Sequence, residues 1–159
     1  MYARDHALIA TPIGAIRIEG DDHAVAAVRI GAEGDAAPGS AAAVRAAAEQ
    51  IRQWFAGERM AFSVPLAAAE TPRGQALRDG LLAVGYGETL GYGELAQRLG
   101  SSARAIGQLC ARNPLPLLVP CHRVLASGGT LGHYSAGEGP RTKSWLLEHE
   151  RRFARRTLL

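Results

Sequence analysis

The sequence predicts an α+β protein of two parts: a small mixed α/β domain over residues 1–66 and a mainly helical domain over residues 74–159. Short strand patterns around proline and glycine open the chain, whereas helical spacing of apolar residues dominates its second part. Residues 67–73 form the linker between them. A chain of 159 residues, 47% of them hydrophobic, is long enough for one full domain with a small companion.

Composition excludes several classes of protein. No apolar run approaches the roughly 20 residues that a membrane-spanning helix needs, so we expect no membrane partner. The N-terminus lacks the charged-then-apolar layout of a secretory signal, which favours a cytoplasmic protein. The two cysteines, Cys110 and Cys121, are then expected to be free thiols, of which one is a candidate for catalysis.

The net charge of +3 is a mild excess, and the basic side chains are almost all arginine, with Lys143 as the single lysine. Arginine provides phosphate contacts and planar stacking, so the charge is compatible with a nucleic-acid partner. A compositional bias of the genome is the alternative explanation for the arginines, and the many alanines and glycines support it. On charge alone we favour the compositional explanation.

The first domain opens with a predicted hairpin. Strands over residues 8–10 and 15–19 flank a turn at Pro12–Gly14, and residues 25–30 add a third strand. Ile16 and Ile18 share one face of the second strand because side chains alternate. Residues 31–40 form a loop of small residues.

Ser40 is the predicted cap of a helix that runs to about Phe55, and Gly57 ends this helix. Nothing in the first domain indicates a functional site: His6 and His23 are isolated from any cysteine, so a zinc site is not expected. We assign this domain a structural role. The apolar stripe of its helix consists of Val44, Ala48, Ile51, Trp54 and Phe55.

Three helices are predicted at the start of the second domain, over residues 75–84, 92–99 and 103–111. Gly100 separates the last two, and Ser101 or Ser102 caps the third. Two short helices joined by a tight turn are typical of a helix-turn-helix, although such pairs also occur in proteins that never touch DNA.

The third of these helices has an unusually bare exposed face. Ala103, Arg104 and Gly107 place one cation between two residues with almost no side chain. Such a face lets a partner approach the helix backbone closely, while the arginine reaches deeper. A surface helix in a chain rich in alanine and glycine is the alternative explanation.

The candidate chemistry lies in the segment after this helix. Residues 117–119 read as a buried strand, Pro120 stops it, and Cys121 and His122 follow. A nucleophile beside a base indicates covalent chemistry, but adjacent side chains of a strand point to opposite faces. A Cys–His pair therefore needs an irregular backbone or a bridging water, and a structural role stays open. The closing helix, from about Thr142 to Phe153, offers two groups to orient the imidazole, Glu148 and Glu150.

Several motifs resemble one known family. They are Pro120-Cys-His-Arg-Val124, Asn113-Pro114 after Ala103-Arg-Ala-Ile-Gly107, Tyr92-Gly-Glu-Leu-Ala96, Gly132-His-Tyr-Ser135 and Lys143-Ser-Trp-Leu-Leu-Glu-His-Glu150. Over residues 71–150 the chain is similar to the O6-alkylguanine-DNA alkyltransferases. The resemblance implies a ribonuclease H-like first domain, a helix-turn-helix in the second, and a monomer that binds double-stranded DNA containing O6-alkylguanine through its minor groove. It implies no cofactor and no metal.

The resemblance also assigns residue roles. Cys121 accepts the alkyl group of O6-alkylguanine, or of O4-alkylthymine, once and irreversibly; His122 is the base, acting through a water molecule, and Glu150 orients it. Asn113 is the hinge, and Tyr92 crowds the backbone phosphate to help rotate the nucleotide. The remaining roles are DNA contact and occupation of the vacated stack (Arg104, Ala103, Gly107, Arg112) and contact with the guanine edge (Val124, Tyr134, Ser135).

The sequence departs from the family pattern at Arg73, at Arg78, and in a loop after Tyr134 that is about two residues longer than usual. Because that loop borders the alkyl pocket, it bears on which alkyl groups fit. Three functions remain to be compared: dealkylation of DNA, lesion binding without transfer, and a cysteine hydrolase that uses Cys121 and His122.

Overall fold

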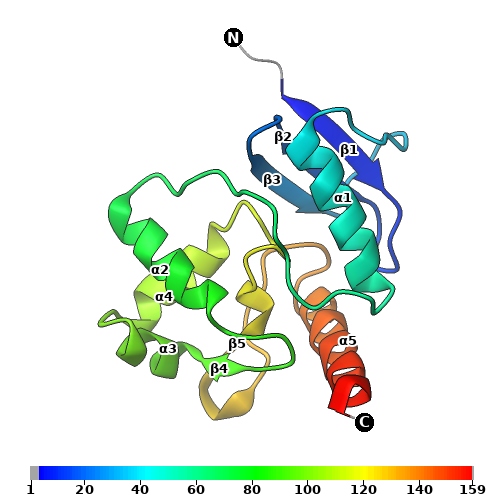
Figure 1. The fold of residues 1–159 in the computed structure, drawn as a ribbon. Coiled ribbons are helices and arrows are strands. Elements are labelled where there is room, and N and C mark those ends of the chain that lie inside the picture. The colour runs from blue at the N-terminus through cyan, green and yellow to red at the C-terminus, as the bar shows by residue number, and fades with distance from the viewer. Residues whose placement is uncertain (1–3, 159) are drawn as a thin grey trace. The chain divides into compact units, whose positions relative to one another are not determined.

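The structure is a computed structural model that describes residues 4–158. The chain divides into two compact units, with the boundary between Ala67 and Ala68. The first unit contains a three-stranded sheet and one helix, and the second contains four helices and one short strand pair (Figure 1).

The sheet of the first unit has the predicted hairpin and third strand. Strands β1 (Asp5–Ile9), β2 (Ile16–Gly20) and β3 (Val25–Ile30) pair antiparallel in the order β1-β2-β3. Ile16 lies opposite Ile9 on one side and Ile30 on the other. Ile16 and Ile18 are both fully buried, so the predicted alternation of faces is confirmed.

Helix α1 (Ala42–Phe55) packs against this sheet with its apolar face. The predicted stripe is buried along its length, with Phe55 half-buried at its end. Gly57 has φ +77°, and its amide donates to the Trp54 carbonyl, which ends the helix as expected.

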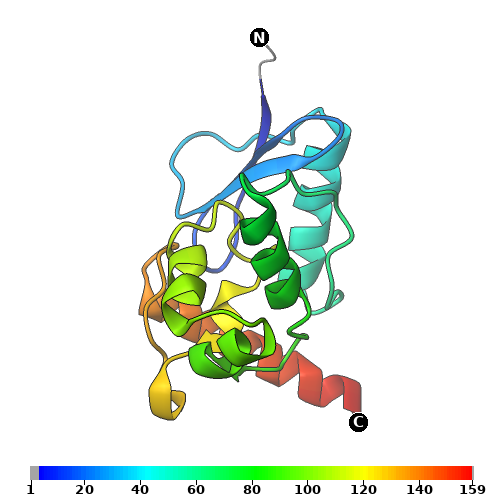
Figure 2. The same ribbon diagram turned by 90° about the vertical axis from the view of Figure 1, so that its left-hand side faces the viewer.

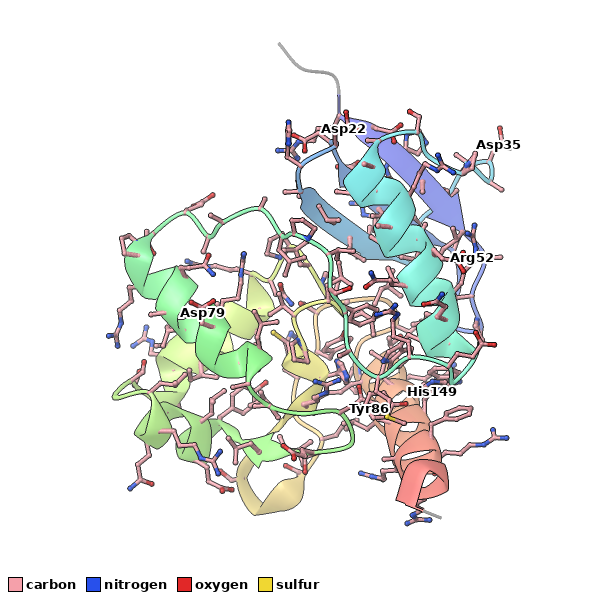
Figure 3. All side chains as sticks on the ribbon, viewed as in Figure 1. Asp22, Asp35, Arg52, Asp79, Tyr86 and His149 are labelled. Atoms are coloured by element: carbon pink, nitrogen blue, oxygen red, sulfur yellow. The ribbon has the colours of Figure 1, made fainter. Side chains whose placement is uncertain are left out.

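The predicted Ser40 cap of this helix is wrong. The residue that precedes α1 is Ala41, and its side chain makes no capping hydrogen bond. Instead, the Asp5 carboxylate accepts from the amides of Ser40 and Ala41, each at 2.7 Å, and Asp22 accepts from Ala42 at 2.8 Å. Asp22 lies near the start of α1 in Figure 3. Carboxylates brought by the sheet therefore satisfy the free amides of the helix start.

The first helix of the second unit is α2 (Pro72–Leu82), which begins three residues earlier than predicted and has Pro72 in its first turn. Thr71 caps α2 by accepting from the Gly74 amide at 3.0 Å. The predicted inward side chains Leu77, Leu81 and Val84 are buried.

Helices α3 (Tyr92–Arg98) and α4 (Ala103–Ala111) follow, and they pack on each other. Gly100 turns the chain with φ +62°, and Ser102 caps α4 by accepting from the Ala105 amide at 3.1 Å. Figure 2 shows this helical cluster from the side.

A two-stranded parallel pair, β4 (Leu90–Gly91) with β5 (Val124–Leu125), joins the start of α3 to the segment that contains Cys121. The closing helix α5 (Pro140–Leu158) is longer at both ends than predicted. It packs against η1 (Cys121–Arg123), a single turn of 3₁₀ helix, and so lies beside the candidate site.

The predicted strand over residues 117–119 is wrong. These residues form a turn in which Leu117 has φ +74°, a conformation that strands do not contain. The prediction of burial holds, because Leu117, Leu118 and Val119 are at most 3% exposed. An apolar run without a period cannot distinguish a strand from a buried turn.

We predict that Asp5→Asn lowers the midpoint of thermal unfolding at neutral pH. The amides of Ala41 and Ser40 lower the pKa of Asp5 below its ordinary value of 3.8 in the folded state. This stabilisation is complete above the unfolded pKa and is lost as pH falls through the folded pKa. Melting followed by circular dichroism at about pH 7 and about pH 2 should show a difference between the proteins only at the higher pH. Asp35→Asn, at an exposed position, is the matched control.

Candidate active site and nucleic-acid interface

Cys121 is the first residue of η1 and is 2% exposed. Its amide donates to the Val119 carbonyl at 2.8 Å, and the Arg123 amide donates to Pro120 at 3.0 Å. This tight turn replaces the extended backbone that would send the side chains of Cys121 and His122 to opposite faces. The irregular backbone that a Cys–His pair requires is therefore present.

Asn113 holds the turn in place from the end of α4. Its side-chain amide donates to the Val119 carbonyl at 3.2 Å and to the Cys121 sulfur at 3.4 Å, while its oxygen accepts from the Leu115 amide at 2.9 Å. The Asn113 side chain thus links the end of α4 to Cys121, the candidate nucleophile. The predicted hinge residue therefore lies between these two elements.

Glu150 of α5 contacts the neighbouring base. Its Oε2 lies 2.8 Å from Nε2 of His122, and both side chains are almost completely buried. Glu148, the alternative, is exposed and lies 3.4 Å from Arg151. Of the two carboxylates considered from the sequence, the structure brings only Glu150 to the histidine.

Arg123 completes this buried network. Its guanidinium donates to both oxygens of Glu150, with Nη2 at 2.8 Å from Oε2 and Nε at 2.9 Å from Oε1, and Nη1 donates to the Val84 carbonyl at 2.7 Å. The Gly87 amide also donates to Glu150, at 3.2 Å. The Tyr86 ring lies 5.8 Å below the guanidinium and beside α5 in Figure 3. Arg123 belongs to the motif quoted from the sequence but was assigned no role there, and Gly87 was not predicted as a site residue.

These contacts determine the charges of the pair. Burial favours the neutral form of Glu150, but the hydrogen bonds from His122 and Arg123 outweigh it and lower the pKa of Glu150 to about 2. Burial lowers the pKa of His122 although Glu150 opposes this shift. An ionised carboxylate only accepts, so Nε2 of a neutral His122 carries the hydrogen. Its Nδ1, which has no hydrogen-bond partner among the described residues, is left as the proton acceptor.

A second thiol lies against the first. The sulfur of Cys110 on α4 is hydrogen-bonded to that of Cys121, and this bond and burial raise the pKa of Cys121. Asn113 and Lys143 act in the opposite direction and favour the thiolate. This pairing was not predicted from the sequence, because Cys110 lies on α4 and Cys121 lies on η1.

A cavity of about 880 Å³ is lined by Cys110, whereas Cys121 is not among its lining residues. Ala103, Gly107 and Cys110 of α4 form one side. Tyr134 is buried, burial raises the pKa of its phenol, and the hydroxyl has no hydrogen-bond partner among the described residues. Other members of the lining are Tyr92, Leu125, Gly132 and Ser135.

Three of the predicted contact residues are not among those that line the cavity. Arg104 and Arg112 are exposed at the two ends of α4, where solvent surrounds them. Val124 is fully buried in β5 and pairs with Leu90, while its carbonyl accepts from Lys143. A Cβ built on Gly107 meets nothing within 4 Å, so the bare face predicted for α4 is open.

Within residues 4–158, no cluster of three or more histidine, cysteine, aspartate or glutamate side chains has the arrangement of a metal site. No helix in the described part of the chain is both long enough and apolar enough to cross a membrane.

The chain is similar to known proteins both in sequence and in fold. Residues 73–152 match the DNA-binding domain of 6-O-methylguanine DNA methyltransferase. A constitutive methylated-DNA–protein-cysteine methyltransferase of Bacillus subtilis is 42% identical over 107 residues, which is 66% of this chain and 64% of the relative. A protein of the same name from Methanosarcina acetivorans is 35% identical over 153 residues, covering 91% of this chain and 97% of the relative.

Among solved structures, that of Mycobacterium tuberculosis OGT in complex with DNA is similar to this chain with a TM-score of 0.81 and 33% identity. The similarity covers 93% of each chain. A matched family domain over half of the sequence and a relative matched over nearly its whole length lead to one conclusion. The chain belongs to the family of methylated-DNA–protein-cysteine methyltransferases.

Proposed function

We propose that the protein repairs O6-alkylguanine in duplex DNA by moving the alkyl group onto the sulfur of Cys121. The observation that carries this proposal is the buried thiol at a tight turn, held by Asn113 and adjacent to a histidine whose far nitrogen is fixed by Glu150. A cavity bordered by the neighbouring Cys110 gives an alkylated base a place beside the thiol. O4-alkylthymine presents the same alkyl–oxygen bond and is the second substrate.

The reaction is a single displacement. The Cys121 proton passes through a water molecule to Nδ1 of His122, and the thiolate attacks the alkyl carbon. The sulfur–carbon bond forms while the carbon–O6 bond breaks, and its electron pair stays on the guanine, which takes up the proton that His122 had accepted. The products are an S-alkylcysteine and an unmodified guanine, so atoms and charges balance.

The product limits the protein to one reaction. A thioether has no reasonable leaving group at neutral pH, so Cys121 is not regenerated. The protein is therefore consumed stoichiometrically, and it acts as a monomer that carries its own acceptor.

Delivery of the base is assigned to the α3–α4 pair, which we interpret as a helix-turn-helix in the second domain. The bare face at Ala103 and Gly107 allows α4 to lie in the minor groove, and the exposed Arg104 fills the stack that the flipped nucleotide leaves. Arg112, at the other end of α4, contacts the phosphate backbone. Flipping costs a few kcal/mol, and an inserted side chain offsets part of it.

The remaining site residues bind the flipped nucleotide. Tyr92, at the start of α3, crowds the backbone phosphate, while Tyr134 and Ser135, which also line the cavity, contact the base. Val124 contributes only its backbone, because its side chain is buried in β5. The first domain, over residues 1–66, has a structural role.

We predict that incubation with an oligonucleotide containing O6-methylguanine adds one methyl group per molecule, located on Cys121. Intact-mass analysis and peptide mapping measure both the number and the position. Cys121→Ser should stay unmodified. An unmodified wild-type protein that still binds the oligonucleotide would instead support a lesion-binding module, and a methyl group on Cys110 would make the neighbouring thiol the acceptor.

We predict that Arg104→Ala slows repair in duplex DNA about tenfold or more, because loss of the inserted side chain removes part of the energy that offsets flipping. Reaction with free O6-benzylguanine, which requires no flipping, should change less than about twofold. Single-turnover rates on both substrates test this. Arg45→Ala, an exposed arginine on α1, controls for the loss of one positive charge. Equal losses on the two substrates contradict the role of Arg104.

We predict that Glu150→Gln slows methyl transfer about tenfold or more, because a neutral amide replaces the ionised carboxylate that fixes the tautomer of His122. Removing one partner of a buried ion pair should also cost about 3–5 kcal/mol of unfolding free energy. With a folded pKa of about 2, Glu150 stabilises the wild type above its unfolded pKa of 4.5, and this stability is lost as pH falls through about 2.

The matched control for this variant is Glu148→Gln, an exposed carboxylate on the same helix. Urea unfolding at several pH values should show the acid-dependent loss in wild type and in Glu148→Gln, but a flatter profile in Glu150→Gln. Transfer rates are measured on the folded fraction. A normal rate in Glu150→Gln contradicts the assignment of Glu150 as the positioning residue.

A further inference from the structure

Arg73 is an exposed cation in the first turn of α2, at a position where the sequence departs from the family pattern. Within residues 4–158, no carboxylate forms an ion pair with it. Asp79, the acidic residue of α2, accepts from Gln75 at 2.9 Å instead. Neither the packing of α2 nor the proposed transfer reaction accounts for this unpaired charge.

The guanidinium of Arg73 lies beside the turn that joins α3 to α4. Nη2 donates to the Ser101 hydroxyl at 3.2 Å, across 28 positions of the sequence. Ser101 directly precedes Ser102, the cap of α4, and α2 packs on α4 (Figure 1). The hydrogen bond therefore places a cation of α2 next to the start of α4, the helix to which we assign DNA binding.

Ser101 holds this cation without neutralising it. A hydroxyl oxygen carries no charge and accepts from one N–H of a guanidinium that has several, so the remaining donors can reach a second acceptor. The planar guanidinium matches the oxygens of a phosphate. A side chain that one hydrogen bond already orders also loses less conformational freedom when it binds. Arg73 is thus prepared for an anionic partner.

Further unpaired arginines surround the same helix. Arg104 lies in the first turn of α4, Arg112 follows its last residue, and Arg98 is the last residue of α3. All three are exposed, and none forms an ion pair with a carboxylate in the described part of the chain. Because the net charge of the whole chain is only +3, these cations are a local excess at the α3–α4 pair. Such an excess fits a polyanion.

The position of Arg73 indicates which part of a duplex it meets. A helix that lies in a groove of DNA has a phosphate backbone on each side. Side chains on the inserted face reach the bases, whereas cations beside the helix reach the backbone. Arg104 belongs to the first kind. Arg73 belongs to the second, because α2 carries it and Ser101 holds it at the start of α4.

We propose that Arg73 is a DNA-binding residue that contacts a backbone phosphate of the duplex beside the start of α4, and that Ser101 positions its guanidinium. This contact is additional to those assigned to Arg104 and Arg112. It contributes affinity without preference for sequence or lesion and fixes the register of α4 on the duplex. The inference deepens the proposed function and rests on it for its biological meaning.

A structural role makes a different prediction. If Arg73 only ties α2 to the turn before α4, its charge has no bearing on DNA affinity. Arg73→Gln keeps a donor for Ser101 and removes the charge, whereas Arg73→Lys keeps the charge. Ser101→Ala keeps the charge and removes the hydrogen bond that orders it. Arg45→Gln, at an exposed position on α1, is the matched control for the loss of one positive charge.

The measurement is the affinity for an undamaged duplex, followed by fluorescence anisotropy at several salt concentrations. Each phosphate contact contributes about 0.9 to the steepness of log K against log salt. We expect Arg73→Gln to lose about this amount of slope and about five- to tenfold in affinity at about 0.1 M salt. Arg73→Lys and Arg45→Gln should keep the wild-type slope. Ser101→Ala should keep it too, with an affinity about two- to threefold lower.

A slope in Arg73→Gln that equals the slope in Arg45→Gln overturns the inference. Circular dichroism confirms that each variant is folded before its slope is compared.

A second measurement locates the contact on the DNA. Single phosphates of a duplex with one O6-methylguanine are replaced in turn by neutral methylphosphonates, and both proteins carry Cys121→Ser so that no alkyl group moves. At the contacted phosphate, the replacement should weaken binding about fivefold or more when Arg73 is present. It should have almost no effect in Arg73→Gln, because that variant has already lost the partner. Additive losses at every position overturn the inference.

These outcomes are separable from the proposed function. The salt dependence is measured on undamaged DNA, so absence of methyl transfer by the wild-type protein contradicts the repair activity but leaves the slopes unaffected. If wild type transfers the methyl group and the slope does not respond to Arg73→Gln, repair stands and the phosphate contact of Arg73 fails.

Discussion

The site depends on one buried carboxylate. Glu150 accepts from His122, Arg123 and the Gly87 amide, and so connects α5 to η1 and to the turn before β4. A single buried charge would be costly, but here two cationic or polar side chains and a backbone amide replace its water shell. The same contacts fix the tautomer of His122, so the interaction that joins α5 to η1 also prepares the base for proton transfer.

Much of the fold followed from local patterns. The hairpin, the apolar stripe of α1 and the α3–α4 pair were correctly predicted, because their periodicity and caps lie within a few residues. The helix start at Ala42 was not, since its cap comes from Asp5, 35 residues before Ser40. The run 117–119 was misread because burial leaves no period in the sequence, and only the positive φ of Leu117 distinguishes a turn from a strand.

The site was predicted only in part for a related reason. Motifs singled out Cys121, His122, Asn113 and Glu150, and the structure brings these four together. The motifs did not show what Cys110, Arg123 and Lys143 contact, because tertiary packing supplies each partner. Cys110 meets the thiol of Cys121, and Arg123 meets the carboxylate of Glu150. Lys143 donates to carbonyls that lie 19 and 10 positions away in the sequence. Motifs identify which residue types are present, but they do not show which of these residues tertiary packing brings into contact.

The charges of the buried site are largely paired with one another. Glu150 is ionised and forms an ion pair with Arg123, and His122 is neutral because burial lowers its pKa. A buried thiol is ordinarily a poor nucleophile, since burial opposes its ionisation. In this arrangement the Asn113 amide donates to the sulfur and favours the thiolate, while the neutral His122 leaves its Nδ1 available to take up the proton.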